Sequence, residues 1–464
     1  MRGAVAAGHP LTAEAGARVL REGGNAVDAA VAAALVSWVS ESTLTGPGAG
    51  GFMLVHRARD CSTRVLDFFV AMPGLGLPGS ALAEMEEVDV DFSGGSTQLF
   101  RIGAASCAVP GAALGLEEAH RAYGTRPWAD LFESAIELAR GGVELTRGQA
   151  YLHAILDLIL RHTSESRAIY ERGGERLVAG DLLVQDDLAR TLELLSDQGA
   201  SGGVLIGYAL LLLDRLGGAG GGAGSAEAIA RLAEVMREQT RSRGGSFTSD
   251  LYRGGLVGRL YAPASIGAAT RRIERREVGR LEVAGAPGTT HISVVDAAGT
   301  AASLTASNGS GSGVVVPGTG IHLNNMLGEF DLPKPPRAGD RLSSGMSPSL
   351  VLHEQRPRLV VGSAGSLRLR GAVMQIVVNV VQHGLDVRQA IDRPRVHLEG
   401  EHLHCEGGHD PAELDKLEAM GWDVTRWRRR NLFFGGAAAV EMRVDGTLAA
   451  AGDPRRGGAG VVVR

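Results

Sequence analysis

Two adjacent threonines at the head of an alternating segment constrain this chain more than any other feature. Thr289 and Thr290 follow a Pro-Gly pair and open the alternation of residues 290–296, and a second such segment covers residues 300–305 after Ala-Ala-Gly. The two segments predict a β-hairpin. A threonine hydroxyl is a weak nucleophile that needs an adjacent base. If the bond after Gly288 were cut, the new α-amine, with an ordinary pKa of about 7.7–8.0, would supply that base.

Helices and further strands are predicted on both sides of this hairpin. Thr12 is a candidate N-cap for a helix that ends before Gly23, and Asn25 is a candidate N-cap for a second helix with Asp28 in its first turn. The second helix, residues 26–39, is apolar almost all round, which predicts burial between layers. Other predicted elements are strands at 51–56, 62–69 and 359–363, and helices at 128–145 and 371–381.

Composition sets looser bounds on the protein. Of 464 residues, 44% are hydrophobic and the formal charge is −5, which suits a globular core and leaves no basic excess for nucleic acid. The longest apolar run, residues 204–213, is too short for a membrane helix of roughly 20 residues. Cys61, Cys107 and Cys405 are odd in number and widely spaced, and residues 1–10 do not have the apolar run of a signal peptide. We therefore expect a cytoplasmic protein with no nucleic-acid or membrane partner.

Short motifs in a fixed order run along most of the chain. They are GHPL at residues 8–11, GGNAVDAA at 23–30, GGFMLV at 50–55, GTGI at 318–321, LNN at 323–325, SSGMSP at 343–348 and GSAGS at 362–366. In order and context this set resembles the γ-glutamyltranspeptidase family of N-terminal-nucleophile hydrolases. The resemblance implies the α+β fold of that family, a four-layer αββα sandwich, which agrees with strand hairpins flanked by helices.

The resemblance also implies a chain that cuts itself between Gly288 and Thr289. Residues 1–288 would be the large-subunit region and residues 289–464 the small-subunit region, and the two would form one joint structural unit. Thr289 would then cleave a γ-glutamyl, glutathione-like donor or a similar small acyl amide through an acyl-enzyme. The implied partners are this donor, a water or amine acceptor, and the two cleavage fragments themselves, with no cofactor and no metal.

Residues around the nucleophile take roles from the same resemblance. Gly365 and Ser366 align with the glycine pair that forms the family's oxyanion hole, with serine in place of the second glycine. Thr290 would be a supporting hydroxyl, and Ser307 replaces a threonine that hydrogen-bonds the nucleophile region. For Thr289 itself, the alternative is an ordinary β-branched residue that opens a strand.

Four further residues are implied to bind the donor. Ser343 and Ser344 would hydrogen-bond its α-carboxylate. Glu329 would hold its α-ammonium, and Asn308 would contact the substrate. The alternatives are a polar turn for the two serines, a turn-capping role for Asn308 and a solvent-exposed carboxylate for Glu329.

Two departures from the family leave the donor and the activity open. Phe69 stands where relatives have an arginine that clamps the α-carboxylate. Either the donor is not a γ-glutamyl compound, or another arginine replaces the missing one; the candidates are Arg341, Arg368 and Arg370. The chain also lacks, near residues 199–203, a segment that the family carries. The alternative functions are therefore an amidase with a different donor, and an uncleaved, inactive scaffold or binding protein.

Two other patterns have ordinary structural interpretations. A group of potential metal ligands lies close together in the sequence; it comprises His397, His402, His404, Cys405 and His409. This segment also resembles a strand and turn of the family, so no metal is predicted. Residues 217–224 are rich in glycine and are expected to form a loop, because no βαβ unit follows them to make a dinucleotide site.

Overall fold

The computed structural model describes residues 2–73, 84–91, 97–193, 262–275, 288–329 and 339–464, together with residues 230, 234, 237, 238, 241, 259 and 337. The predicted deletion near residues 199–203, the apolar run at 204–213 and the glycine-rich stretch at 217–224 lie outside these residues.

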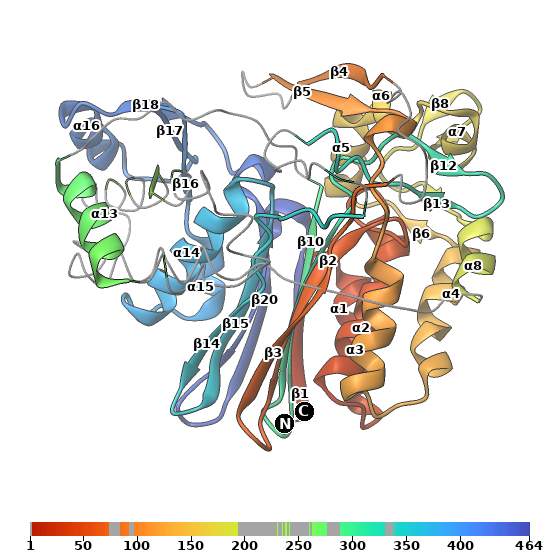
Figure 1. Cartoon of the computed structure of the whole chain (residues 1–464), viewed down its shortest axis with the longest axis horizontal. Helices are drawn as coiled ribbons and strands as arrows, with labels where there is room; N and C mark the ends of the chain where they lie inside the picture. Colours follow the sequence, from red (N-terminus) through yellow and green to blue (C-terminus); the bar gives the residue numbers. More distant parts are fainter. Residues whose placement is uncertain are drawn as a thin grey trace.

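Two antiparallel sheets pack face to face at the centre of the molecule (Figure 1). The larger has the order β21-β1-β10-β11-β2-β3, with the bounds Ala459–Val463, Gly3–Ala7, Thr290–Asp296, Ala301–Ser307, Gly50–Arg57 and Ser62–Phe68. The smaller has the order β14-β15-β19-β20, with the bounds Ser349–His353, Arg356–Ala364, Gly436–Met442 and Leu448–Gly452.

Helices cover the outer face of each sheet and complete four layers. On the six-stranded sheet lie α1 (Pro10–Arg21), α2 (Ala26–Ser40) and α3 (Ala112–Tyr123) (Figure 1). On the four-stranded sheet lie α14 (Arg368–Val381) and α15 (Val387–Asp392). This arrangement confirms the α+β class and the αββα sandwich predicted for the chain.

The predicted hairpin and the predicted apolar helix form the buried centre of the sandwich. Every residue of β10 and β11 is buried, because one sheet face contacts α2 and the other contacts the second sheet. Every residue of α2 is buried as well, which accounts for its apolar character all round. Asn25 caps α2 and forms a capping box with Asp28, as the sequence predicts.

The N-cap prediction for the first helix is wrong. His9, not Thr12, caps α1, because its Nδ1 accepts a hydrogen bond from the backbone N–H of Leu11 at 3.2 Å. Pro10 occupies the first helical position, where its missing N–H is not needed. Thr12 lies inside the helix and is fully buried.

The predicted helix at residues 128–145 is broken into two pieces. A 3-10 turn, η2, covers Trp128–Phe132 and α4 covers Glu133–Gly141. Gly142 follows with a φ of 84°, a conformation that favours glycine and ends the helix. The sequence at 371–381 is helical as predicted, but α14 begins three residues earlier, at Arg368.

The remaining elements surround the sandwich at its edges. The strands are β4 (Glu86–Asp91), β5 (Thr97–Ile102), β6 (Val143–Glu144), β7 (Glu171–Arg172), β8 (Glu175–Arg176), β9 (Leu182–Leu183), β12 (Val315–Val316), β13 (Ile321–His322), β16 (Val396–Glu399), β17 (His402–Cys405) and β18 (Asp423–Arg426). The helices are η1 (Ala104–Ser106), α5 (Arg147–Ile155), α6 (Asp157–Leu160), α7 (Ser164–Tyr170), α8 (Asp186–Leu192), α13 (Pro263–Arg275), α16 (Pro411–Ala419), η3 (Leu432–Phe434) and η4 (Pro454–Arg456). Within the ranges given above, no helix has the length and apolar character needed to span a membrane.

Candidate active site

The hairpin places the proposed nucleophile beside the last residue of the neighbouring strand. Thr289 comes directly before β10, and Ser307 is the last residue of β11. The antiparallel register pairs Thr290 with Ala306, so the start of one strand lies opposite the end of the other. Thr289 is 4% exposed, and its Oγ1 donates a hydrogen bond to Ser307 Oγ at 3.1 Å.

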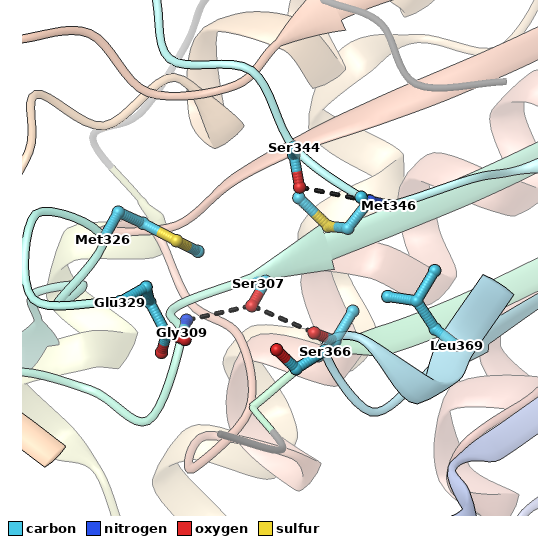
Figure 2. A pocket seen from close by; sticks show the side chains of 10 residues that line it. Ser307, Gly309, Met326, Glu329, Ser344, Met346, Ser366 and Leu369 are labelled. Atoms are coloured by element: carbon cyan, nitrogen blue, oxygen red, sulfur yellow. Dashed lines mark hydrogen bonds between the residues drawn. The ribbon is translucent and has the colours of Figure 1, made fainter. Parts of the chain in front are cut away.

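The hydroxyl of Ser307 uses its full hydrogen-bonding capacity at this point. It accepts from Thr289 Oγ1, at 3.1 Å. It also accepts from the backbone N–H of Gly309, at 2.9 Å (Figure 2). It donates its own proton to the carbonyl oxygen of Gly288. One donor and two acceptor sites are all that a hydroxyl offers. Ser307 therefore connects the hydroxyl of Thr289 to the carbonyl of the peptide bond that precedes it.

The residue before Thr289 has to be a glycine in this conformation. A Cβ atom added to Gly288 would overlap the carbonyl oxygen of Gly309. Gly309 itself has a φ of +67°, a left-handed conformation that favours glycine. The missing side chain at Gly288 lets the segment before Thr289 lie directly against the backbone of Gly309.

A pocket opens beside these groups, with about 320 Å³ of space that includes its mouth to the solvent. Its lining combines hydroxyls, one carboxylate and apolar side chains; the residues are Thr289, Ser307, Gly309, Met326, Glu329, Ser344, Gly345, Met346, Ser366 and Leu369 (Figure 2). Five of the residues predicted from the sequence thus come together around one cavity: Thr289, Ser307, Glu329, Ser344 and Ser366.

Three other predicted site residues lie next to this lining but are not part of it. Asn308 is fully buried, and its backbone N–H donates to the carbonyl of Leu44 at 3.0 Å. Ser343 is 2% exposed and precedes the lining residue Ser344. Gly365 precedes the lining residue Ser366. Among the described residues, neither Asn308 Oδ1 nor Ser343 Oγ has a hydrogen-bond partner.

The predicted oxyanion loop has the backbone conformation that its glycine motif suggests. Gly365 has a φ of +122°, and a Cβ atom added there would lie 2.9 Å from the Cα of Gly435. Ser366 has a φ of 52°, so serine adopts the left-handed conformation that normally favours glycine. The backbone N–H of Arg368 donates to the carbonyl of Gly365 at 3.0 Å, which starts α14 directly after the loop.

Among the residues that the structure describes, no arginine belongs to the pocket lining. Phe69 is buried and stacks on Phe52, with ring centroids 5.4 Å apart. Arg341 forms an ion pair of 2.6 Å with Asp67. The Arg368 guanidinium lies over the Phe433 ring, 4.1 Å from its centroid.

Arg370 lies close to one residue of the pocket lining. A Cβ atom added to Gly345, which lines the pocket, would be 3.7 Å from Arg370 Nε. Arg370 is 3% exposed and is not itself among the lining residues. Glu329 is the one charged side chain that the described lining contains.

Thr290 and two residues that the sequence analysis missed lie behind the nucleophile. Thr290 Oγ1 donates to Glu41 Oε2 at 2.6 Å, and Arg456 Nη1 donates to the carbonyl oxygen of Thr289 at 3.4 Å. The one sequence signal for Glu41 was a carboxylate at the end of a helix predicted to be wholly buried. Nothing in the sequence pattern singled out Arg456.

The histidine group has protein partners in the structure. His397 and His404 are cross-strand neighbours in β16 and β17. His404 lies 3.5 Å from Glu399, and His402 Nδ1 lies 2.5 Å from Asp423 Oδ2. No three His, Cys, Asp or Glu side chains in the described ranges are arranged so that they could hold a metal ion.

A comparison with models of known protein families shows to which family the chain belongs. The family model described as Gamma-glutamyltranspeptidase matches residues 12–202 and 200–463. The chain belongs to the gamma-glutamyltranspeptidase family. The two matched segments of this gamma-glutamyltranspeptidase model meet at residues 200–202, beside the place where the sequence predicts a missing segment.

Relatives within the gamma-glutamyltranspeptidase family have two kinds of name. The chain is 31% identical to "Acylase ACY 1 proenzyme" of Pseudomonas sp. (strain SE83), with 100% of this chain and 94% of that protein covered. It is 28% identical to "Glutathione hydrolase proenzyme" of Escherichia coli (strain K12), with 98% and 90% covered. Both names describe enzymes, and the chain is an enzyme of the hydrolase and acyltransferase type that this family contains.

Solved structures support the fold assignment. Cephalosporin acylase from Bacillus halodurans superposes with a TM-score of 0.82 at 21% identity, over 99% of this chain and 95% of that chain. At this level of identity the likeness establishes the shared four-layer fold.

Proposed function

We propose that the chain cleaves itself between Gly288 and Thr289 and that the mature Thr289 is the nucleophile of a small-molecule amidohydrolase and acyltransferase. The observation that carries the proposal is the path from Thr289 Oγ1 through Ser307 Oγ to the carbonyl oxygen of Gly288. Burial of these three groups strengthens their polar interactions, because water does not compete for them.

Self-cleavage follows from this arrangement in balanced steps. Thr289 Oγ attacks the carbonyl carbon of Gly288, and its proton passes to Ser307 while Ser307 passes its own proton to the carbonyl oxygen. Collapse of the intermediate breaks the C–N bond, leaves an ester on Oγ and transfers a proton to the nitrogen of Thr289. Water then hydrolyses the ester, which releases the carboxylate of Gly288 and restores the hydroxyl of Thr289. The new α-amine lies on the same residue as the nucleophile.

Turnover would repeat this chemistry on a donor amide. The α-amine of Thr289 accepts the Oγ proton while Oγ attacks the donor carbonyl. The backbone N–H groups of Gly365 and Ser366 would stabilise the oxyanion, since the loop lies at the pocket and α14 follows it. The leaving amine takes a proton as the C–N bond breaks. Water hydrolyses the acyl-enzyme, or an amine acceptor takes the acyl group.

The donor is a γ-glutamyl, glutathione-like amide or another small acyl amide, and one observation favours the second. Glu329 offers a carboxylate to a donor ammonium group, but the three predicted replacement arginines are not part of the described lining. The pocket wall is formed instead by Met326, Met346 and Leu369, which belong to the same apolar cluster as Phe69. Such a wall does not compensate a buried carboxylate.

Four matched anilides would separate these donors after maturation has been shown. The 4-nitroanilides of γ-glutamate, 4-aminobutanoate, glutarate and butanoate differ only in the presence of the ammonium and carboxylate groups. An enzyme specific for glutathione-like donors requires both groups, so only the γ-glutamyl compound would be cleaved well. An amidase with the pocket described above cleaves the 4-aminobutanoyl compound at least as well as the γ-glutamyl one.

The competing account is an uncleaved, inactive scaffold or binding protein. A Thr289→Ala variant is the matched control for both maturation and turnover. If the purified wild-type chain remained whole and inactive toward all four anilides, as the variant should, the scaffold account would replace the proposed enzyme.

A further inference from the structure

The start of β10 is held by charged side chains from both sides of the proposed cleavage point. Glu41 lies in region 1–288, at the C-terminal end of α2, and accepts a hydrogen bond from Thr290 Oγ1 at 2.6 Å. Arg456 lies in region 289–464, in η4, and donates from Nη1 to the carbonyl oxygen of Thr289 at 3.4 Å. The peptide group between the two threonines is thus restrained at its carbonyl and through the next side chain.

The Glu41 carboxylate is built into the core as a fixed acceptor. It is 5% exposed, and its second oxygen accepts a hydrogen bond from Thr12 Oγ1 at 2.8 Å. Burial raises the pKa of Glu41, and the hydrogen bonds from Thr290 and Thr12 and the positive charge of Arg456 offset only part of this rise. Burial also lowers the pKa of Arg456 to about 10, so this guanidinium stays protonated at neutral pH. A buried charge is tolerated where such partners are in place.

Gly8 packs directly against the contact between Glu41 and Thr290, where a side chain would not fit. A Cβ atom added to Gly8 would overlap Glu41 Oε2 and would lie 2.9 Å from Thr290 Oγ1. Gly8 therefore allows the carboxylate and the hydroxyl to meet at the edge of β1. The contact is a close-packed feature of the fold, not the encounter of two mobile surface groups.

A chain terminus made by cleavage needs such restraints. Before cleavage, Thr289 is held by peptide bonds on both sides; afterwards one of these is lost, and free chain ends fray unless they are tied down. A nucleophile displaced by about 1 Å can lose about a hundredfold in rate. The residues that hold the peptide after Thr289 therefore act on the reaction without touching the donor.

We propose that Glu41 and Arg456 are positioning residues, which fix the new N-terminal Thr289 through the hydroxyl of Thr290 and the carbonyl of Thr289. This role rests on the proposed self-cleavage and amide turnover. Because Glu41 belongs to one fragment and Thr290 to the other, the contact also makes the large fragment necessary for an ordered nucleophile.

Replacement of Thr290 tests this role with little change in shape. Thr290→Val keeps the β-branched side chain but cannot donate to Glu41, whereas Thr290→Ser keeps the hydroxyl. Ser37→Ala is the matched control, because Ser37 is a buried hydroxyl one turn earlier in α2 that donates to the carbonyl of Ala34. For each chain we would measure the self-cleavage rate, the thermal unfolding midpoint, and kcat and KM with the best anilide of the panel above.

The expected result is a loss of kcat in Thr290→Val of about ten- to hundredfold with KM changed less than about threefold. Thr290→Ser should recover most of this loss, and Ser37→Ala should match the wild type. Failure of Thr290→Val to mature, with Thr290→Ser maturing and similar unfolding midpoints, would support the same role. A wild-type kcat in mature Thr290→Val, or an equal loss in Ser37→Ala, would overturn it. If the wild type itself stayed whole, the proposed function would fail first and this inference with it.

Discussion

Removal of one hydroxyl, in Ser307→Ala, should slow self-cleavage strongly while leaving Thr289 in place. Ser307 donates to the carbonyl oxygen of Gly288 and accepts from Thr289 Oγ1 at 3.1 Å. Loss of one preorganised donor to a developing oxyanion typically costs about 10²–10³ in rate, or roughly 3–4 kcal/mol of activation free energy. Ser307 is 3% exposed, so bulk water does not take over the lost contact. We therefore expect a reduction of at least about a hundredfold.

A time course of intact mass measures this effect directly. Freshly purified wild type, Ser307→Ala and Ser307→Thr would be incubated under folding conditions, and the disappearance of the 464-residue chain would be followed. Ser307→Thr keeps the hydroxyl at a strand end where a β-branched residue is acceptable, so it should cleave within about tenfold of the wild type. Equal cleavage rates in the wild type and Ser307→Ala would refute the hydroxyl path from the nucleophile to the carbonyl.

Three further changes test other parts of the structure. Gly288→Ala places a Cβ atom on the carbonyl oxygen of Gly309, so mass spectrometry should show self-cleavage slowed by at least about a hundredfold. Arg395→Met breaks a buried ion pair of 2.6 Å with Asp453 and should lower the free energy of unfolding in urea by about 3–5 kcal/mol. An unchanged free energy of unfolding would contradict a stabilising role for this ion pair. Burial lowers the pKa of His291 from 6.5 to about 3, so its contribution to stability is complete above pH 6.5 and is lost as the pH falls toward 3. Urea unfolding between pH 4 and 7 should therefore depend on pH less steeply in His291→Gln than in the wild type, and equal slopes would contradict this assignment.

The central elements of the fold could be predicted because they have strong local signals, whereas their αββα arrangement was implied by the family resemblance. The alternation of residues 290–296 gave the hairpin, and the apolar run with a capping Asn25 gave α2. The cap of α1 was missed because histidine is a rare N-cap, and Thr12 was the conventional choice. The end of α4 at Gly142 shows a second limit, since a glycine inside an apolar pattern does not by itself reveal a positive φ.

Of the candidate site, Ser344 and Ser366 lie in short motifs, Thr289 opens the predicted hairpin, and Ser307 and Glu329 follow shortly after the hairpin and the LNN motif, respectively. The structure brings all five to one pocket. The apolar wall of that pocket comes from residues whose individual positions look like ordinary core.

Long-range contacts account for the residues that the sequence analysis missed. Glu41 and Arg456 reach the nucleophile only through the packing of α2 and η4 against the start of β10. They are separated from Thr290 and Thr289 by 249 and 167 positions in the chain, respectively. No local pattern encodes such a pairing, because it depends on how distant elements stack in the folded sandwich.

N-terminal sequencing with intact mass on the purified protein, beside Thr289→Ala, tests the central claim most directly. The account predicts two fragments from the wild type, residues 1–288 and residues 289–464, with threonine 289 as the new N-terminus, and one intact chain from the variant. A wild-type chain that stays whole under folding conditions, or that is cut at another bond, would contradict it.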